Sequence, residues 1–342
     1  MALKKSWLRL AGLSLALLGA GCATQRGNEI RALTDKELHP FFARAKDPRT
    51  FWITVYPSER GPMFAGANRV HMEQARSLPF QPEQTPLLLF ESAAKASMPL
   101  VKFDANRDDE YLALIDTSSR RNWIDFATAQ KTGVIPLGPP AMPDLPAHVQ
   151  DDIPGYASVL SSLRFDQLHV ETALLYTRAG QGPLGPLSRR EEKPYPQLVV
   201  GCDLLKAFQF VQLDYPNRRV IFSASAGYSP DANLLVATVP LREAQGGFAA
   251  QGMINGEAKT FLLDSAGDFE VAMADPPTNV LRQVSVGGLV FRQVEVVSSQ
   301  DCGLGLLKYP RIGRRLLCRY RVTFAPAQRK VHFEKPGGVK AE

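Results

Sequence analysis

The sequence predicts an all-β protein with two related lobes behind an N-terminal extension. Three observations carry this prediction. Short apolar or alternating runs, separated by turn residues, recur from about residue 84 onward; long helical periodicity is absent there; and three short signatures occur twice in the same order. The chain has 342 residues, 45% hydrophobic and 22% charged, which excludes a disordered tail and allows two or three ordinary domains.

The N-terminus has the layout of a bacterial lipoprotein signal. A basic start at residues 4–9 precedes an apolar stretch at 10–18, and small residues at 19–21 lead into Cys22. A cysteine in this place resembles a lipobox, in which the cysteine is lipidated and becomes the first residue of the mature chain. Two other interpretations stay open: an ordinary signal peptide, or a short membrane anchor beside a chance cysteine.

Ala23 stands where bacteria that retain a lipoprotein at the inner membrane tend to have aspartate. We therefore expect a Gram-negative lipoprotein on the periplasmic side of the outer membrane, anchored to the membrane through a lipid on Cys22. The periplasm is oxidising and allows a Cys302–Cys318 disulfide. Two buried free thiols are an equally good interpretation of these cysteines.

The extension gives a mixed signal. Thr34 with Glu37 three residues later predicts a capped helix start. A strand-like run follows at 51–56. No chemistry is evident, and we expect this segment to pack on the main body.

The β-rich part consists of several strand-like runs and two long loops. The runs lie at 87–90, 112–115, 167–176, 198–200, 210–213 and 219–222. Stretches rich in proline and glycine at 138–154 and 180–196 predict surface loops that are too long for simple hairpins, and such loops are often functional. Gly287 and Gly288 predict a hairpin turn.

The internal repeat consists of three paired signatures. The strand that ends in Asp116 and Thr117 pairs with the strand that ends in Asp264 and Ser265. Residues 199–205 then pair with 311–317, and 213–222 with 324–333. The first copy carries both long loops, and the second is shorter. The chain thus divides into a signal peptide (1–21), an N-terminal extension (22–80), a first lobe (81–228) and a second, shorter lobe (229–342).

These residues resemble the aspartic proteases of the pepsin and retropepsin type. In that family an apolar strand ends in Asp-Thr/Ser and a small residue, and an apolar-apolar-Gly motif follows in the same lobe. Residues 116–124, including Trp123, are similar to the first active-site loop, and 264–267 to the second. The resemblance covers roughly residues 84–335.

The resemblance implies a bilobal acid-protease-like fold of two related, β-barrel-like lobes, with Asp116 and Asp264 as a catalytic pair. Two like charges about 3 Å apart cannot both ionise, so one aspartate keeps a proton. The ionised aspartate then acts as base on a shared water, and the protonated one donates to the substrate carbonyl. Thr117 and Ser265 are expected to bond across the pair and brace it.

The resemblance also assigns supporting positions. Ser118 and Ala266 are the third residues of the two loops, where backbone amides approach the carboxylates; Ser118 stands where the family prefers glycine. Gly201 and Gly313 are expected beneath the loops, where a side chain would collide.

Only the first lobe has room for a flap over the cleft, around 151–159. Gly155 and Tyr156 are its candidate tip.

Composition excludes several classes of function. Lys and Arg number 40 against 34 Asp and Glu, a net charge of +6, which is too mild for a nucleic-acid surface. The 5 histidines lack paired spacing, and no serine-hydrolase elbow or nucleotide glycine motif occurs. We therefore expect no metal, no cofactor and no nucleic-acid partner.

Two remaining features have ordinary interpretations. Cys202 is expected to be a small buried residue. The basic run 311–321 is expected to be a solvated face, or else a contact for lipid headgroups or an acidic partner.

Two functions follow. The first is a lipid-anchored periplasmic aspartic endopeptidase that takes an extended peptide or protein between its lobes. One chain supplies both aspartates, so a monomer suffices. The second is a peptide- or protein-binding lipoprotein that keeps the fold without catalysis, which Ser118 and the short second lobe favour.

Overall fold

The structure is a computed structural model. It describes residues 31–45, 69–72, 83–91, 97–137, 153–166, 168–182, 184, 195–224, 226–304 and 307–336. The expected strand at 51–56, most of both long loops and Cys22 lie outside these residues.

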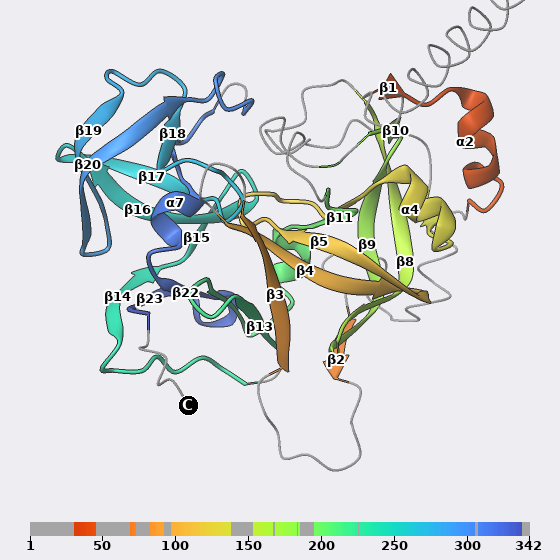
Figure 1. Ribbon diagram of the computed structural model, residues 1–342, viewed down its shortest axis with the longest axis horizontal. Coiled ribbons are helices and arrows are strands. Elements are labelled where there is room, and N and C mark those ends of the chain that lie inside the picture. The colour runs from red at the N-terminus through yellow and green to blue at the C-terminus, as the bar shows by residue number, and fades with distance from the viewer. Residues whose placement is uncertain are drawn as a thin grey trace, which may run out of the picture.

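The fold is all-β with two lobes, as expected, and each lobe contains a closed six-stranded barrel (Figure 1). The first barrel consists of β4 (Ser97–Ala105), β5 (Arg107–Ile115), β6 (Trp123–Ile124), β8 (Gly155–Phe165), β9 (Leu168–Arg178) and β11 (Leu198–Val200). The second consists of β16 (Gly247–Ile254), β17 (Glu257–Leu263), β18 (Val271–Met273), β19 (Val280–Val286), β20 (Leu289–Ser298) and β21 (Arg311–Ile312).

The two barrels have the same topology. The first runs β4-β5-β11-β6-β9-β8 and closes through β4 with β8; the second runs β16-β17-β21-β18-β20-β19 and closes through β16 with β19. In both barrels the strand that ends at the aspartate pairs in parallel with the strand that precedes the glycine signature. The repeat found in the sequence is therefore a repeat of structure.

Shorter elements complete each lobe. They are α4 (Phe126–Lys131), β7 (Ile135–Pro136), β10 (Gly180–Gln181) and α6 (Cys202–Leu205) in the first lobe, and β15 (Arg242–Ala244), α7 (Arg314–Leu317) and η3 (Pro326–Gln328) in the second. The strand β2 (Arg69–Met72) pairs with β9. None of the helices in the described part of the chain is long and apolar enough to cross a membrane.

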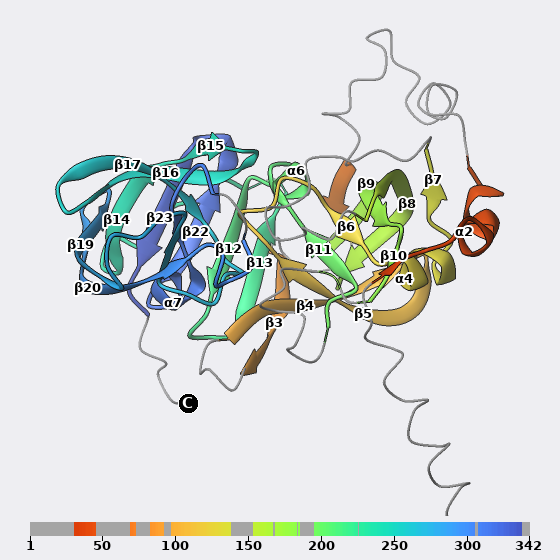
Figure 2. The same ribbon diagram turned by 90° about the horizontal axis from the view of Figure 1, so that it is seen from above.

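A six-stranded antiparallel ladder joins the lobes (Figure 2). The strands are, in order, β14 (Leu235–Pro240), β23 (Lys330–Glu334), β22 (Arg321–Ala325), β12 (Phe210–Asp214), β13 (Arg219–Ser223) and β3 (Glu83–Glu91). The junction between lobes is the pair β12 with β22, where Val211 lies opposite Phe324. The two central hairpins correspond to the third signature of the repeat, and each turns through an arginine with positive φ, Arg218 and Arg329.

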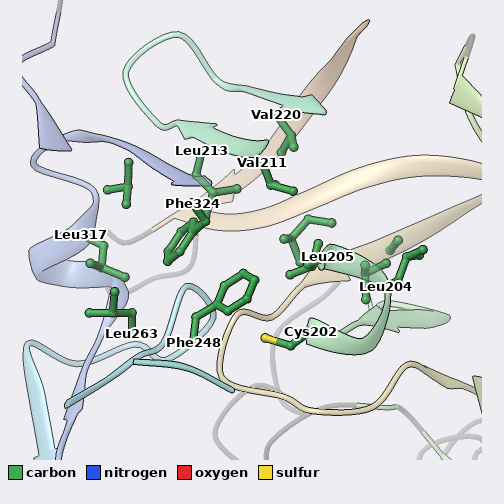
Figure 3. Close-up of a cluster of buried hydrophobic side chains, with 14 of the residues drawn as sticks. Cys202, Leu204, Leu205, Val211, Leu213, Val220, Phe248, Leu263, Leu317 and Phe324 are labelled. Atoms are coloured by element: carbon green, nitrogen blue, oxygen red, sulfur yellow. The ribbon is translucent and has the colours of Figure 1, made fainter. Parts of the chain in front are cut away.

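The largest hydrophobic core continues from one lobe into the other. Figure 3 shows Val211 and Leu213 of the first lobe facing Phe248 and Phe324 of the second. The rings of Phe248 and Phe324 stack with centroids 5.4 Å apart. Ile115 and Leu263, the residues directly before Asp116 and Asp264, belong to this shared core, so packing as well as the ladder fixes how the lobes meet.

The described part of the extension packs on the first lobe. The strand β1 (Arg31–Ala32) pairs with β10. Thr34 is the N-cap of α2 (Asp35–Phe42), as predicted, and Glu37 accepts a hydrogen bond from the Thr34 N–H at 2.9 Å. Hydrogen bonds from Arg31 and Thr34 lower the pKa of Glu37 to about 2. The ring of Phe41 is fully buried and lies 5.4 Å from that of Phe126.

Replacing Phe41 by alanine tests whether the extension is part of the folded unit. We expect Phe41→Ala to lower the free energy of unfolding by about 3–5 kcal/mol, because it leaves a cavity in the first-lobe core. Phe42→Ala is the matched control, since Phe42 is only half-buried, and its effect should be smaller. Urea unfolding followed by tryptophan fluorescence measures both. Equal, small losses would mean that the core does not depend on α2.

Candidate functional site

The first aspartate loop follows β5. The N–H of Asp116 donates to the carbonyl of Val200 at 2.9 Å, which ties the loop to β11. Oδ1 of Asp116 accepts three hydrogen bonds: from the N–H of Ser118 at 3.0 Å, from its hydroxyl at 2.7 Å and from the N–H of Ser119 at 3.2 Å. The carboxylate is 1% exposed, and one of its oxygens is thus firmly oriented.

The second loop repeats this arrangement after β17. The N–H of Asp264 donates to the carbonyl of Ile312 at 2.8 Å, and Oδ1 accepts from the N–H groups of Ala266 at 3.1 Å and Gly267 at 2.7 Å. Asp264 is 0% exposed. Ala266 packs in a cluster with Val199.

Four hydrogen bonds cross between the loops, two made by each hydroxyl side chain. The hydroxyl of Thr117 accepts from the N–H of Ser265 at 3.1 Å and donates to the carbonyl of Leu263 at 2.5 Å. In return, the hydroxyl of Ser265 accepts from the N–H of Thr117 at 3.0 Å and donates to the carbonyl of Ile115 at 2.7 Å. Thr117 and Ser265 thereby hold the two aspartate loops against each other, which is the geometry expected for these residues.

Gly201 and Gly313 lie beneath the loops. A Cβ added to Gly201 would lie 2.3 Å from the carbonyl oxygen of Arg121, and one added to Gly313 would lie 2.2 Å from that of Phe269. Backbone cannot yield as a flexible side chain can, so neither position accepts a side chain without a shift of the loop.

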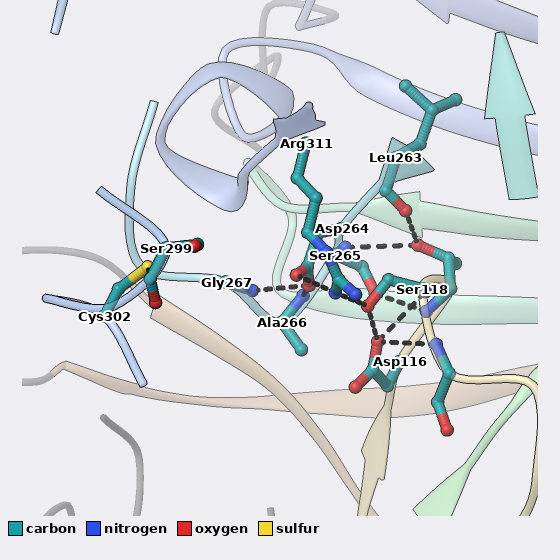
Figure 4. A network of polar contacts seen from close by, with 12 residues as sticks. Asp116, Ser118, Leu263, Asp264, Ser265, Ala266, Gly267, Ser299, Cys302 and Arg311 are labelled. Carbon is teal, nitrogen blue, oxygen red and sulfur yellow. Dashed lines mark hydrogen bonds and ion pairs between the residues drawn. The ribbon is translucent and has the colours of Figure 1, made fainter. Parts of the chain in front are cut away.

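A buried arginine, Arg311 of β21, joins the two carboxylates. Its Nη1 donates to Oδ2 of Asp264 at 3.1 Å and to the hydroxyl of Ser118 at 2.9 Å. Because Ser118 donates onward to Asp116, a continuous chain runs Asp116–Ser118–Arg311–Asp264 (Figure 4). Arg311 is 2% exposed and Ser118 is 6% exposed. Ser118 is therefore a member of the site. Its φ is not positive, so the backbone at this position does not require glycine.

Arg311 is the functional residue that the sequence interpretation missed. The signal was present in the repeat: residues 199–201 read Val-Val-Gly, and 311–313 read Arg-Ile-Gly. Arg311 therefore takes the place of Val199, which packs beside Ala266 of the opposite loop. Twofold reasoning places Arg311 beside Ser118, where the structure has it.

The interpretation of 311–321 as a solvated face is wrong for Arg311 and for Arg314, because both are buried. Arg314 makes an ion pair with Asp268 at 3.3 Å. The other arginines of the run are more exposed and pair with Asp268, Glu270, Glu295 and Glu334. These arginines thus form ion pairs within the protein, and a contact of the run with lipid headgroups or an acidic partner stays a prediction.

Besides Arg311, two thiols and a phenol lie near the aspartates. Burial and the charge of Asp264 raise the pKa of the Cys302 thiol to about 11. Burial also raises the pKa of Cys202, whose Sγ donates to the carbonyl of Thr117 at 3.2 Å, and the pKa of Tyr215, whose hydroxyl donates to the carbonyl of Ser265 at 3.3 Å. Cys202 is thus a buried structural thiol, as expected. Cys302 and Cys318 are free thiols in the structure, as in the second of the two alternatives left open by the sequence, but both are half-buried and not buried.

The expectation that Gly155 and Tyr156 form the tip of a flap is wrong. Both residues begin the long strand β8, with Gly155 opposite Arg178 in the ladder with β9. The ring of Tyr156 is buried 4.5 Å from that of Phe42. They lie at the base of the connection between β7 and β8, and residues 138–152 of that connection are outside the described part. In the second lobe only 274–279 join β18 to β19.

Metal binding has no candidate cluster: within the described ranges, no group of three or more His, Cys, Asp or Glu side chains could hold an ion. A cavity of about 690 Å³ lies elsewhere in the first lobe, between α2, α4 and the segment before β11, with Glu37 and Tyr195 in its wall. Neither Asp116 nor Asp264 lines this cavity.

Comparisons with known proteins add no assignment. No protein-family model matches the chain, and no curated protein sequence matches it. The argument about function therefore rests on the geometry of the aspartate loops.

Removing the hydroxyl of Thr117 tests the bonds between the lobes. Thr117→Val keeps the shape of the side chain but leaves the Ser265 N–H and the Leu263 carbonyl without their partner, at about 1–3 kcal/mol for each buried group. Thr132→Val is the matched control, because the buried Thr132 hydroxyl makes one bond, to Thr128, within a single lobe. Chemical denaturation gives both changes. Equal losses of unfolding free energy in the two variants would show that the hydrogen bonds between the loops stabilise the protein no more than one within a single lobe.

Proposed function

We propose that the protein is a lipid-anchored periplasmic aspartic endopeptidase, in which Asp116 and Asp264 hydrolyse a peptide bond through a shared water. The observation that carries this proposal is the reciprocal bonding of Thr117 and Ser265. It brings two buried aspartates together from symmetric loops of two barrels.

The chemistry proposed is general acid–base hydrolysis. A carboxylate takes a proton from the water as the water oxygen attacks the carbonyl carbon. The C–N bond then breaks, and the same proton goes to the leaving amine. Backbone N–H groups orient each Oδ1, and we assign the proton transfer to the Oδ2 atoms, of which that of Asp264 also accepts a hydrogen bond from Arg311.

Asparagine variants test the catalytic pair. Peptide-library cleavage by the soluble form that starts at Ala23 should be lost in Asp116→Asn and in Asp264→Asn at every pH from acid to neutral. Asp116→Asn is the cleaner variant, because Asp264 also compensates the buried charge of Arg311. Asp166→Asn is the matched control: Asp166 is exposed, and its positive φ of 55° suits asparagine. Cleavage by folded Asp116→Asn, checked by circular dichroism, would refute the proposal.

A second candidate is peptide binding without catalysis. The contact of Arg311 with Oδ2 of Asp264 favours it, because that oxygen is one of the two proposed to hold the water. The same library decides: peptides that are retained by the wild-type protein and recovered uncut at every pH would favour binding.

The lipid anchor is tested at Cys22. The full-length protein, expressed in a Gram-negative host, should partition into the detergent phase and carry lipid detectable by mass spectrometry. Cys22→Ala should remain in the aqueous phase without lipid. Cys302→Ala, which changes a half-buried thiol, is the control and should behave as wild type. Lipid on the Cys22→Ala protein would place the anchor elsewhere.

A further inference from the structure

The charge balance of the site points to a role for Arg311. The site holds two buried carboxylates and one buried guanidinium, and the guanidinium bonds directly to Asp264 and, through Ser118, to Asp116. In a carboxylate pair without such a cation, a shared proton supplies the positive charge that keeps both groups together. Here the guanidinium already supplies that charge, and arginine does not lose its proton in proteins.

We propose that Arg311 takes the place of the shared proton, so that Asp264 stays a carboxylate and Asp116 alone carries the proton during the reaction. This inference rests on the two-aspartate site of the proposed function. Protonating Asp264 would leave a buried guanidinium without its counter-charge, and that is strongly unfavourable. The two aspartates thus have different protonation roles, even though their loops are related by a near-twofold symmetry.

The surrounding groups leave this assignment in place. In the described part of the chain, three groups lie close enough to the aspartates for their pKa values to respond to the carboxylate charge: Cys202 in α6, Tyr215 after β12 and Cys302 after β20. Asp203 and Lys206 act in turn on Cys202, Arg314 on Tyr215, and Asp301 on Cys302. The thiols and the phenol are neutral at neutral pH. Lys206 pairs with Glu243, Asp203 with Arg121, and Arg314 with Asp268.

A reaction sequence follows with balanced protons. Asp116 takes one proton from water as the new C–O bond forms, and gives it to the amine as the C–N bond breaks. The negative charge that develops on the carbonyl oxygen lies near the guanidinium of Arg311, which takes the part that a protonated aspartate plays in a proton-sharing pair. Activity then needs Asp116 ionised, and it persists as the pH rises to neutral.

The experiment is a titration that needs no substrate. The soluble form from Ala23 is labelled with [4-¹³C]aspartate, and the carboxyl signals of Asp116 and Asp264 are assigned with the asparagine variants and followed from pH 8 to acid. In the wild type, Asp264 should show no proton uptake between about pH 8 and pH 4. In Arg311→Val, which restores the residue found at the equivalent Val199, the pair should take up one proton about 1–3 pH units higher than in wild type.

Controls keep the outcomes distinct. Arg311→Lys retains the charge and should keep the wild-type titration. Arg311→Met, which removes the charge but keeps a long side chain, replaces Arg311→Val if that variant does not fold. Proton sharing in the wild type above about pH 5, or identical titrations of wild type and Arg311→Val, would overturn the inference. Because the readout is spectroscopic, absence of peptide cleavage would count against the proposed function and leave this result standing.

The pH profile of kcat/KM provides the second arm. Wild type should keep its activity up to neutral pH, whereas Arg311→Val should lose activity on the alkaline side as its pair gives up the shared proton. Cleavage that depends on both aspartates, together with a wild-type titration that shows a shared proton, would support the peptidase and refute the role of Arg311.

Discussion

The structure depends on the reciprocal hydrogen bonds between Thr117 and Ser265. Each hydroxyl accepts from the backbone of the opposite loop and donates to the residue before the opposite aspartate. The bonds are buried, so water cannot replace them, and breaking one leaves unpaired polar groups. They fix the distance and the relative orientation of the two loops. The ladder and the shared core hold the two lobes in the relative position that these hydrogen bonds require.

The two lobes are related by a pseudo-twofold axis, but they differ at one pair of equivalent positions beside the aspartates. Val199 and Arg311 occupy equivalent positions, yet one packs against Ala266 and the other bonds to Ser118. The exchange is matched on the opposite side, because Ser118 supplies an oxygen where Ala266 supplies a methyl group. Aspartic proteases prefer glycine at the position of Ser118. In this chain the Ser118 hydroxyl accepts a hydrogen bond from Arg311, which explains why serine stands there. The two substitutions form one unit.

Much of the architecture was predictable because the repeat is a repeat of backbone. The paired signatures predicted which strands carry the aspartates, and the steric role of Gly201 and Gly313 followed from their place beneath the loops. The arginine-rich run suggests a solvated face, and this outweighed the repeat, which aligns Arg311 with the apolar Val199; the packing shows that Arg311 and Arg314 are both buried. Tyr156 was misplaced because an aromatic beside glycine suits a flap as well as a strand start; its burial depends on Phe42, far away in the chain.

The ladder between the lobes has a consequence for how the chain folds. One edge of β12 pairs with β13, which follows a few residues later in the chain. The other edge pairs with β22 (Arg321–Ala325), which follows only about a hundred residues later. Until that segment has been synthesised, the first lobe presents an open strand edge of the kind that recruits other chains. Closure of such distant pairings is slow. Folding of this protein is therefore most exposed to aggregation in the interval before β22 and β23 become available.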